Sequence, residues 1–422
     1  MQRFILLLIG LSAPALFAEE SLKGNKLEDY LQRALSANPD LQQFEHRYQA
    51  AKQRIPQMSA LPDPMLQVTH FVEPIQTRTG PQENAVVFNQ RIPWFGKIKH
   101  REWAASAEAE ALWFAYQNRQ LRLVREVSTL FYEYAYLQQA LHITRENLAL
   151  LKSIEPIAET RVKAGASLNS LLRLKVEIGK TDDRLQSLAQ KQVALSATLK
   201  AMLALPEGDL LPWPMVDETQ LLSLNPEKLQ ADLLRENPAL HMLEQKIISA
   251  EARKTLADLE RYPDVVLGVN YMQIGDSEMS PPPMDSGQDA WGVTAGISIP
   301  LWWNKNKATR AEAQENLNAS EQELRQKQNM LKAELTASLT LLNDAQRRLI
   351  LYGDDLLDLA QQSVDNSFRA YEVDQTGILE VIDSERSLLE LQLLYWRAVS
   401  DAWQQRIRIQ TLVNHPLDGV NL

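Results

Sequence analysis

The chain repeats one order of motifs at a spacing of about half its 422 residues. An Asn-Pro pair opens an apolar helical stretch at Asn38 and again at Asn237, and a Pro-Asp pair ends the stretch at Pro62 and again at Pro263. A duplication of this kind constrains the fold more than any other feature, because each copy must form the same structural unit. The predicted unit is a helix, two strands and then two very long helices.

Each copy leaves its strands through an aromatic phrase that leads into a long helix. The first phrase is Pro93-Trp94-Phe95-Gly96-Lys97, and the second is Pro300-Leu301-Trp302-Trp303-Asn304-Lys305. Between the copies, residues 205–214 are rich in turn-forming proline and glycine. We therefore predict a first structural repeat over residues 19–211 and a second over residues 212–422.

The first 18 residues are expected to be a secretory signal peptide. Arg3 precedes a mostly apolar run from Phe4 to Ala18, and Glu19 and Glu20 follow it. This run is too short to cross a bilayer as a helix, and no stretch of 18 apolar residues occurs elsewhere. We therefore expect export from the cytoplasm and no membrane-spanning helix.

Composition excludes several classes of function. The chain has 44 Lys and Arg against 54 Asp and Glu, and this net charge of −10 argues against nucleic acid as a partner. Because it has no cysteine, it can form no disulfide, thiolate metal site or cysteine nucleophile. Its 6 histidines stand far apart, and no zincin, serine-hydrolase or phosphate-binding motif is present. We predict no enzymatic activity, no cofactor and no protein metal site.

Four segments alternate between apolar and small or polar residues, as half-buried strands do. They cover residues 65–72, 84–92, 265–273 and 291–299, and the stretches 73–83 and 274–289 are expected to be loops. Strands of about nine residues suit a tilted crossing of a bilayer, although a soluble antiparallel sheet alternates in the same way. The signal peptide and the small, polar second face favour the membrane.

The helices are unusually long for a globular protein. We expect helices over residues 27–60, 95–161, 168–204, 306–370 and 377–412, and the longest would extend on the order of 100 Å at about 1.5 Å per residue. Apolar residues at alternating spacings of four and three predict coiled-coil seams in two of them. One seam comprises Leu185, Leu188, Gln192, Leu195, Leu199 and Met202, and the other Leu331, Leu335, Ser338, Leu342, Ala345, Leu349, Tyr352, Leu356 and Leu359.

Four spanning strands cannot close a barrel, and lipid does not tolerate an open sheet edge. Several chains must therefore share one barrel if the strands do span the membrane. Two chains would give eight strands, whose interior is filled by side chains, whereas three would give twelve and leave an opening. The strand count thus predicts a trimer, with the long helices continuing from the barrel on one side of the membrane.

With these features the sequence resembles the TolC-type outer-membrane efflux channels over essentially its whole mature length. The duplicated order, the Asn-Pro helix starts and the two strand-exit phrases carry the resemblance, and the exit phrases are most similar to the branch that serves heavy-metal pumps. The resemblance implies a mainly α-helical fold with a small β part, in which three copies form a 12-stranded transmembrane barrel and an α-helical periplasmic tunnel. It also implies two partners, a periplasmic adaptor and an inner-membrane pump of the resistance-nodulation-division type.

In this family the turns between the long helices form the periplasmic tip, where the adaptor docks and the tunnel opens as the coiled coils untwist. The first turn of this chain matches the family pattern, and the second carries Asp374 where glycine is usual. Gly165 and Gly377 are expected to permit the turns, and Ser167 and Thr376 to cap the helices that follow. The docking candidates are Arg161, Gly165, Ser167, Leu168, Arg369, Thr376 and Gly377.

Acidic residues are frequent near the second turn. Asp365, Asp374 and Asp383 are candidates for a ring that attracts cations at the tunnel entrance, because threefold symmetry would multiply each charge by three. A solvated helix face is the more common meaning of such a run. Arg347, Arg348 and Arg369 are candidates for ion pairs that close the entrance.

The sequence leaves the exported substrate open. We expect an outer-membrane exit duct for heavy-metal cations, in contact with outer-membrane lipid and with a large periplasmic portion, in a Gram-negative bacterium. A drug-efflux channel or a type I secretion channel is the first alternative. A soluble periplasmic coiled-coil adaptor or scaffold is the second, and it differs in needing no detergent for extraction.

Overall fold

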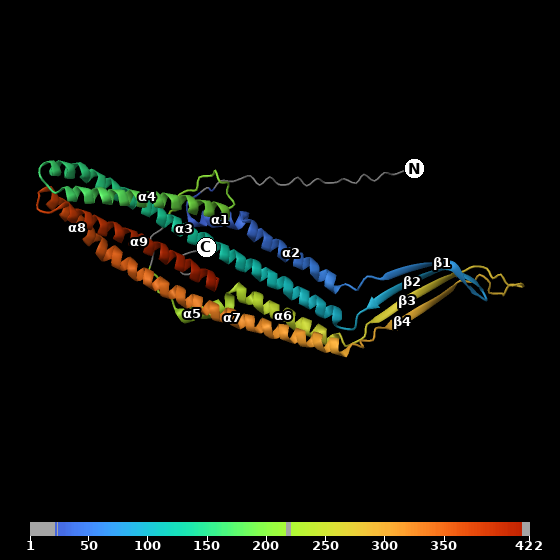
Figure 1. Cartoon of the computed structure of the whole chain (residues 1–422). Coiled ribbons are helices and arrows are strands. Elements are labelled where there is room, and N and C mark those ends of the chain that lie inside the picture. The colour runs from blue at the N-terminus through green and yellow to red at the C-terminus, as the bar shows by residue number, and fades with distance from the viewer. Residues whose placement is uncertain (1–21, 23, 217–220, 416–422) are drawn as a thin grey trace, which may run out of the picture.

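The computed structural model describes residues 22, 24–216 and 221–415, so the predicted signal peptide lies outside the described residues. The chain is elongated, with a β-sheet at one end and the turns of two helical hairpins at the other (Figure 1). Among the described residues, no helix combines the length and the apolar character that a membrane crossing requires.

Both halves contain the same order of elements. The first half contains α1 (Leu27–Ala37), α2 (Pro39–Ser59), β1 (Met65–Thr77), β2 (Gly80–Ile92), α3 (Lys97–Lys163) and α4 (Leu168–Met202). The second half contains α5 (Pro226–Glu236), α6 (Pro238–Leu259), β3 (Val265–Ile274), β4 (Ala290–Ile297), α7 (Trp303–Ile350), the π-helical segment η1 (Leu351–Leu356), α8 (Leu357–Glu372) and α9 (Ile378–Val413).

The two Asn-Pro pairs play the same structural role in both halves. The Asn38 side chain accepts hydrogen bonds from the first turn of α2, and its Nδ2 donates to the Met202 carbonyl at the end of α4 (2.9 Å). The Asn237 side chain likewise caps α6 and donates to the Leu412 carbonyl near the end of α9 (2.7 Å). Each asparagine therefore caps one helix and ties it to the end of another, so that α2 continues α4 and α6 continues α9.

The four strands form one antiparallel sheet in the order β1-β2-β3-β4. The register places Leu66, Phe88, Val269 and Val293 in one row across the sheet. β1 and β2 pair as far as Thr77 and Gly80, so the predicted loop over residues 73–83 is wrong: both strands extend to a tight turn. The alternation breaks down near that turn, which is why it did not indicate strand there.

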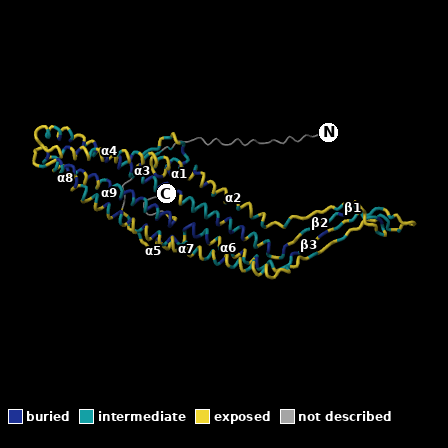
Figure 2. Tube along the Cα trace, in the orientation of Figure 1, coloured by how far each residue is buried: buried dark blue, intermediate teal, exposed yellow. Residues whose placement is uncertain are grey.

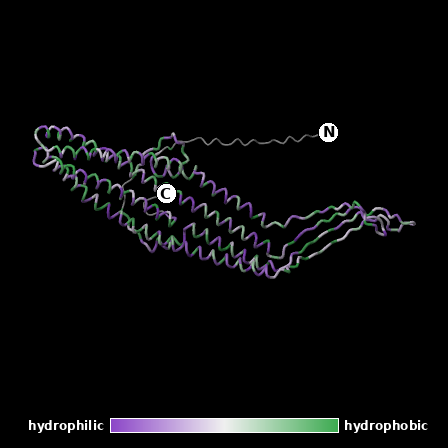
Figure 3. The backbone as a smooth tube through the Cα atoms, in the orientation of Figure 1, coloured by the Kyte–Doolittle hydropathy of each residue, from purple (hydrophilic) through white to green (hydrophobic). Residues whose placement is uncertain are grey.

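One face of the sheet is apolar but is not covered by the chain itself. Val68, Val72, Trp291 and Val293 are each more than half exposed. Figure 2 shows the sheet as mainly exposed or half-buried, and Figure 3 shows apolar residues along the same strands. On the opposite face the small and polar residues predominate, as the hydrogen bond from Asn270 to Thr294 across β3 and β4 illustrates. The sheet therefore has the faces of a barrel wall between lipid and water.

The helices near the sheet form a layer in which α2 packs on α3, α3 on α6, and α6 on α7. Beyond this layer, α3 and α4 form one hairpin, and α7, η1, α8 and α9 form the other. Buried residues along α3 and α9 form the main core where the hairpins meet (Figure 2). The long helices thus bury their apolar seams against each other, as their pattern predicts.

The second predicted seam is correct only up to Leu349. Its residues from Leu331 to Leu349 are buried, but Leu359 is 61% exposed, and Ala360, Val364 and Tyr371 are buried instead. The cause is η1, because a π-helical turn contains one residue more than an α-helical repeat expects. This insertion shifts the buried positions by one residue, so the prediction of a single uninterrupted helix over residues 306–370 is wrong.

Candidate functional site

The two turns that join the long helices lie side by side, at the end of the elongated molecule that is farthest from the sheet (Figure 1). We call these turns, residues 161–168 and 369–377, the tip. In the first turn Gly165 has φ +106°, a left-handed conformation that favours glycine. The Ala166 amide donates to the Arg161 carbonyl (3.0 Å), which closes the end of α3. Gly165 therefore occupies the left-handed position of the first turn, as expected for a glycine that permits the turn.

In the second turn Asp374 adopts the left-handed conformation, with φ +65°. The hydrogen bond from the Gln375 amide to the Ala370 carbonyl (2.8 Å) repeats the closure seen in the first turn. Gly377 has φ −84° and ψ 157°, an extended conformation open to any residue. The predicted role of Gly377 in the turn is wrong, because Asp374 occupies the strained position; aspartate is among the few non-glycine residues that tolerate it.

The predicted side-chain caps are also wrong. Ser167 occupies the N-cap position of α4, but its side chain makes no capping hydrogen bond. Thr376 lies one residue before Gly377, which is the N-cap of α9, and the Thr376 hydroxyl donates to the Glu380 carboxylate (2.5 Å). Glycine at the N-cap leaves the first amides of α9 without a side-chain acceptor from that position.

Arg161 joins the first turn to the second. Its guanidinium forms an ion pair with the Asp374 carboxylate (Nη1 to Oδ1, 3.0 Å) and donates to the carbonyls of Tyr371 and Glu372. The Arg161 Cζ atom lies 4.0 Å from the centre of the Tyr371 ring, within the range of a cation–π contact. The Arg161 side chain therefore contacts three residues of the opposite hairpin, Tyr371, Glu372 and Asp374. No sequence pattern indicated Tyr371 as part of the site.

The other acidic candidates do not gather around Asp374. Asp365 accepts a hydrogen bond from Gln361 of the same helix (3.0 Å), and Asp383 forms an ion pair with Arg386 (3.3 Å). Arg386 also pairs with Glu177 of α4 (2.8 Å) and so links the two hairpins a second time. Within the described residues, no group of three or more His, Cys, Asp or Glu could hold a metal ion.

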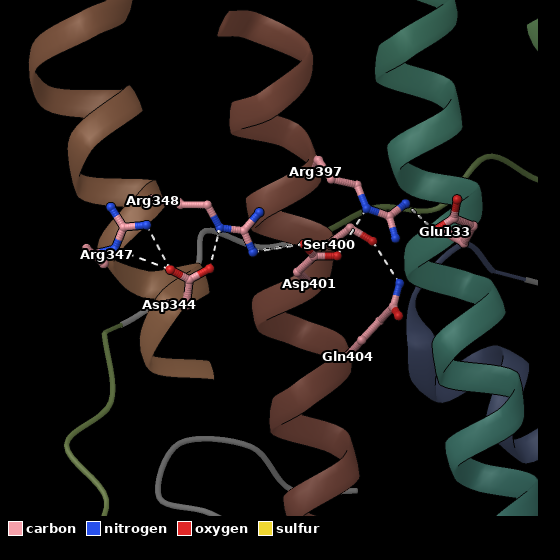
Figure 4. Close-up of polar contacts among 8 residues, drawn as sticks. All are labelled: Glu133, Asp344, Arg347, Arg348, Arg397, Ser400, Asp401 and Gln404. Carbon is pink, nitrogen blue, oxygen red and sulfur yellow. Dashed lines mark hydrogen bonds and ion pairs between the residues drawn. The ribbon is translucent and has the colours of Figure 1, made fainter. Parts of the chain in front are cut away.

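Arg347 and Arg348 form ion pairs inside the chain and away from the tip. Figure 4 shows both arginines against Asp344 of α7, with Arg348 reaching Asp401 of α9 (3.1 Å). The same Asp401 pairs with Arg397 (3.1 Å), which also pairs with Glu133 of α3 (2.7 Å). This chain of charges ties three helices together. It involves none of the acidic residues of the tip.

An apolar stripe on α4 begins at the tip. Leu168 is the first residue of α4, and Leu168, Leu172 and Val176 are each more than half exposed. Their spacing of four residues places all three on one face of the helix. The stripe therefore offers an apolar surface next to the turn. This surface begins at Leu168, a predicted docking candidate, and continues along α4.

A large cavity lies against the helical layer near the sheet. It has a volume of about 1320 Å³ and is lined by residues of α2, α3, α6 and α7. Since all four helices line one cavity, the layer is concave on this side. Its wall carries charges of both signs; Lys246 of α6, for example, pairs with Glu323 of α7 (3.5 Å). The concave face therefore combines charged side chains with alanine-rich apolar surface.

Comparison with known proteins adds sequence and fold relationships. The family model described as outer membrane efflux protein matches residues 30–204 and 229–415. Nodulation protein T of Rhizobium leguminosarum bv. trifolii is 20% identical over 398 residues, which cover 89% of this chain and 82% of that protein.

Two solved structures share the fold. The outer-membrane channel OprN superposes with a TM-score of 0.79 at 17% identity, covering 92% of this chain and 90% of that one. The CusC structure, whose description concerns folding and transmembrane channel formation, superposes with a TM-score of 0.77 at 17% identity, covering 95% and 96%. The long helices and the four-stranded sheet therefore form a TolC-like fold.

Proposed function

This chain belongs to the outer membrane efflux protein family, and from that membership we propose that it forms the outer-membrane duct of a tripartite efflux system. The duct performs no chemistry; it would carry substrates that an inner-membrane pump of the resistance-nodulation-division type delivers through a periplasmic adaptor. The observation that carries this proposal is the sheet with one uncovered apolar face, attached to helices far longer than a globular core requires. A soluble scaffold or adaptor, the second alternative, has no use for such a sheet.

Three copies would complete the barrel. β1 and β4 each have a strand neighbour on one side only, so the sheet has two open edges. In lipid, unpaired backbone groups cost several kcal/mol each, and pairing β1 of one copy with β4 of the next would satisfy them. In the same closure α2 of one copy would meet α7 of the next, because these helices are the edges of the helical layer.

The tip would be the periplasmic entrance of the duct. The contacts of Arg161 with Asp374 and Tyr371 hold the two hairpins together within one chain. If the coiled coils untwist to open the entrance, these contacts are among those that must break. Of the acidic candidates, Asp374 is therefore better placed for holding the entrance closed than for a free cation-attracting ring, since its carboxylate already has a cationic partner.

The adaptor would dock on the tip. The exposed stripe of Leu168, Leu172 and Val176 supplies an apolar surface, and exposed apolar surface of this kind marks interaction sites. The remaining docking candidates lie in or beside the turns: Arg161, Gly165, Ser167, Arg369, Thr376 and Gly377. Among them Arg161 and Gly165 act by shaping and joining the turns.

Heavy-metal cations are the substrates that we favour, because the two strand-exit phrases resemble those of the heavy-metal branch. The concave cavity gives no independent support, since its charges of both signs suit water and many solutes alike. Drugs and secreted polypeptides are therefore the alternatives that a test must separate. A deletion strain challenged with copper, zinc, cobalt and a drug panel makes that separation; drug sensitivity without any metal phenotype would reject the metal proposal.

The duct itself is tested on the purified protein. We expect extraction only with detergent, a molar mass of three chains by light scattering after correction for bound detergent, and stepwise conductance in planar bilayers. A monomer that stays soluble without detergent and forms no pores would contradict the proposal.

A further inference from the structure

A second cavity lies between α3, α8 and α9 beside the tip, and two of its lining residues, Arg369 and Glu372, belong to the second turn. It has a volume of about 600 Å³, within the range of about 300–1,000 Å³ that is usual for small-molecule sites. Much of its lining is apolar and includes Leu150 of α3, Phe368 of α8 and Leu388 of α9. Two lining residues are earlier candidates, Arg369 for docking and Asp365 for the acidic ring, but neither assignment gives the cavity itself a role.

Glu385 lines the cavity from α9, at a position where the neighbouring seam residues are apolar. The residue is 4% exposed. Its Oε2 accepts a hydrogen bond from the Asn147 amide (3.0 Å), whereas its buried Oε1 has no hydrogen-bond partner among the described residues. A buried carboxylate oxygen without a donor is costly, and such atoms are rare in folded proteins.

The other charged residues around the cavity are mostly acidic. Asp365 and Glu372 of α8 and Glu146 of α3 line it, and Arg369 is the one cationic residue in that lining. No ion pair within the part of the chain that the structure describes joins Arg369 to Glu385. Burial raises the pKa of the Glu385 carboxyl; the hydrogen bond from Asn147 opposes this rise, and the nearby charge of Asp365 adds to it. The cavity thus combines an apolar surface with more acidic than basic side chains in its lining.

These properties select the chemistry of a ligand. A bare metal ion is poorly suited, because no group of three or more His, Cys, Asp or Glu among the described residues could hold one. An organic cation beside Glu385 would favour the ionised carboxylate and place an apolar body against Phe368 and Leu388. We propose that this cavity binds amphiphilic organic cations, with Glu385 as the principal counter-ion.

The proposal goes beyond the role of a passive duct and does not depend on it, because binding can be measured on the purified protein. The probe is ethidium, a permanent organic cation, followed by fluorescence anisotropy on the detergent-solubilised full-length protein. The test variant is Glu385→Gln, which keeps the shape of the side chain and removes its charge. The matched control is Glu390→Gln, because Glu390 is an exposed carboxylate on the same helix outside the cavity lining.

We expect Glu385→Gln to weaken ethidium binding by about tenfold or more, since interactions with a buried charged group are strong. Glu390→Gln is expected to bind like the wild type. Asp365→Asn, a change at an exposed position, is expected to weaken binding by about threefold. It keeps the proposal testable if Glu385→Gln does not fold. Binding of the uncharged dye Nile red should be the same in all variants.

Wild-type ethidium affinity in Glu385→Gln would overturn the proposal, as would equal losses in Glu385→Gln and Glu390→Gln. Equal losses of ethidium and Nile red would also overturn it, because they would indicate lost packing and not lost charge. If only Asp365→Asn folds, unchanged ethidium affinity in that variant is the overturning result. Bilayer conductance of Glu385→Gln should remain, so failure of this proposal is distinguishable from failure of the duct function.

Discussion

Lys97 and Asp264 form a buried ion pair where the sheet meets the helices, with 2.8 Å between Nζ and Oδ1. Both side chains are at most 4% exposed, and the Trp94 amide and the Arg91 guanidinium also donate to the same carboxylate. Lys97 belongs to the strand-exit phrase of the first repeat, and Asp264 to the Pro-Asp motif of the second. Residues that the duplication separates in sequence thus form one junction.

Replacing Asp264 with asparagine should destabilise the protein strongly, because it leaves the buried Lys97 ammonium with only the more distant and partly exposed Glu260 carboxylate (3.7 Å) as an anionic partner. Breaking a buried pair in this way typically costs about 3–5 kcal/mol. The matched control is Asp63→Asn, since Asp63 is the exposed counterpart in the first repeat. Thermal unfolding in detergent, followed by circular dichroism, measures both. Equal melting temperatures for the two variants would show that the junction contributes little.

The same carboxyl predicts a pH dependence of stability. Burial by itself would raise the pKa of Asp264, but hydrogen bonds from Lys97, Trp94 and Arg91 outweigh it and hold the pKa below the ordinary value of 3.8. A lowered pKa means that the stabilisation is complete above the ordinary value and is lost as the pH falls below it. We expect wild-type stability to drop below about pH 4 and Asp264→Asn to drop less. If stability falls with pH in the same way in the wild type and in Asp264→Asn, Asp264 is not the source of the pH dependence.

Gly165 and Gly377 should respond differently to alanine. Gly165→Ala places a side chain at φ +106°, and we expect a loss of about 1–2 kcal/mol. Nothing lies within 4 Å of the added methyl group at either position, so contacts do not enter the comparison. Gly377→Ala should be neutral or slightly stabilising, because its backbone is extended. Chemical denaturation of each variant checks the order; a larger loss at Gly377 would contradict the assignment of the turns.

Asp374→Gly should stabilise the second turn by up to about 1 kcal/mol, since glycine adopts the left-handed conformation without strain. The change also removes the ion pair with Arg161, whose contribution is small because Asp374 is 88% exposed. The free energy of unfolding, measured by chemical denaturation, gives the sum of the relieved backbone strain and the lost ion pair. Asp374→Asn keeps the tolerated backbone and loses the charge, so it serves as the control for the ion pair alone.

Arg161→Ala should favour the open entrance, because it removes the ion pair, the cation–π contact and two hydrogen bonds to the opposite hairpin at once. We expect a several-fold higher conductance in planar bilayers, equivalent to about 1 kcal/mol in the closed–open balance. Lys163→Ala is the control, since Lys163 is an exposed cation in the same last turn of α3. Unchanged conductance in Arg161→Ala would show that Arg161 does not hold the entrance closed.

Several features of the fold could be predicted because they depend on neighbouring residues. Asn38 and Asn237 identify helix starts, since capping and the position of proline are local effects, and the period-two alternation located four strands. The strand predicted over residues 65–72 was too short, because the alternation of β1 stops before its hydrogen bonds to β2 do. The burial of Glu385 could have been read from its place in the seam between Ile382 and Leu389, where an acidic residue is out of pattern.

The sequence by itself determined the duplicated units, their helices and strands, and the family. Only the tertiary structure decided which residue takes the left-handed position in the second turn, where η1 shifts the buried face of the helix, and which charges meet. These depend on how distant segments pack: Arg161 meets Asp374, and Lys97 meets Asp264, across more than a third of the chain. No local periodicity records such pairings, because their energies arise from burial and distance that exist only after the two repeats have packed together.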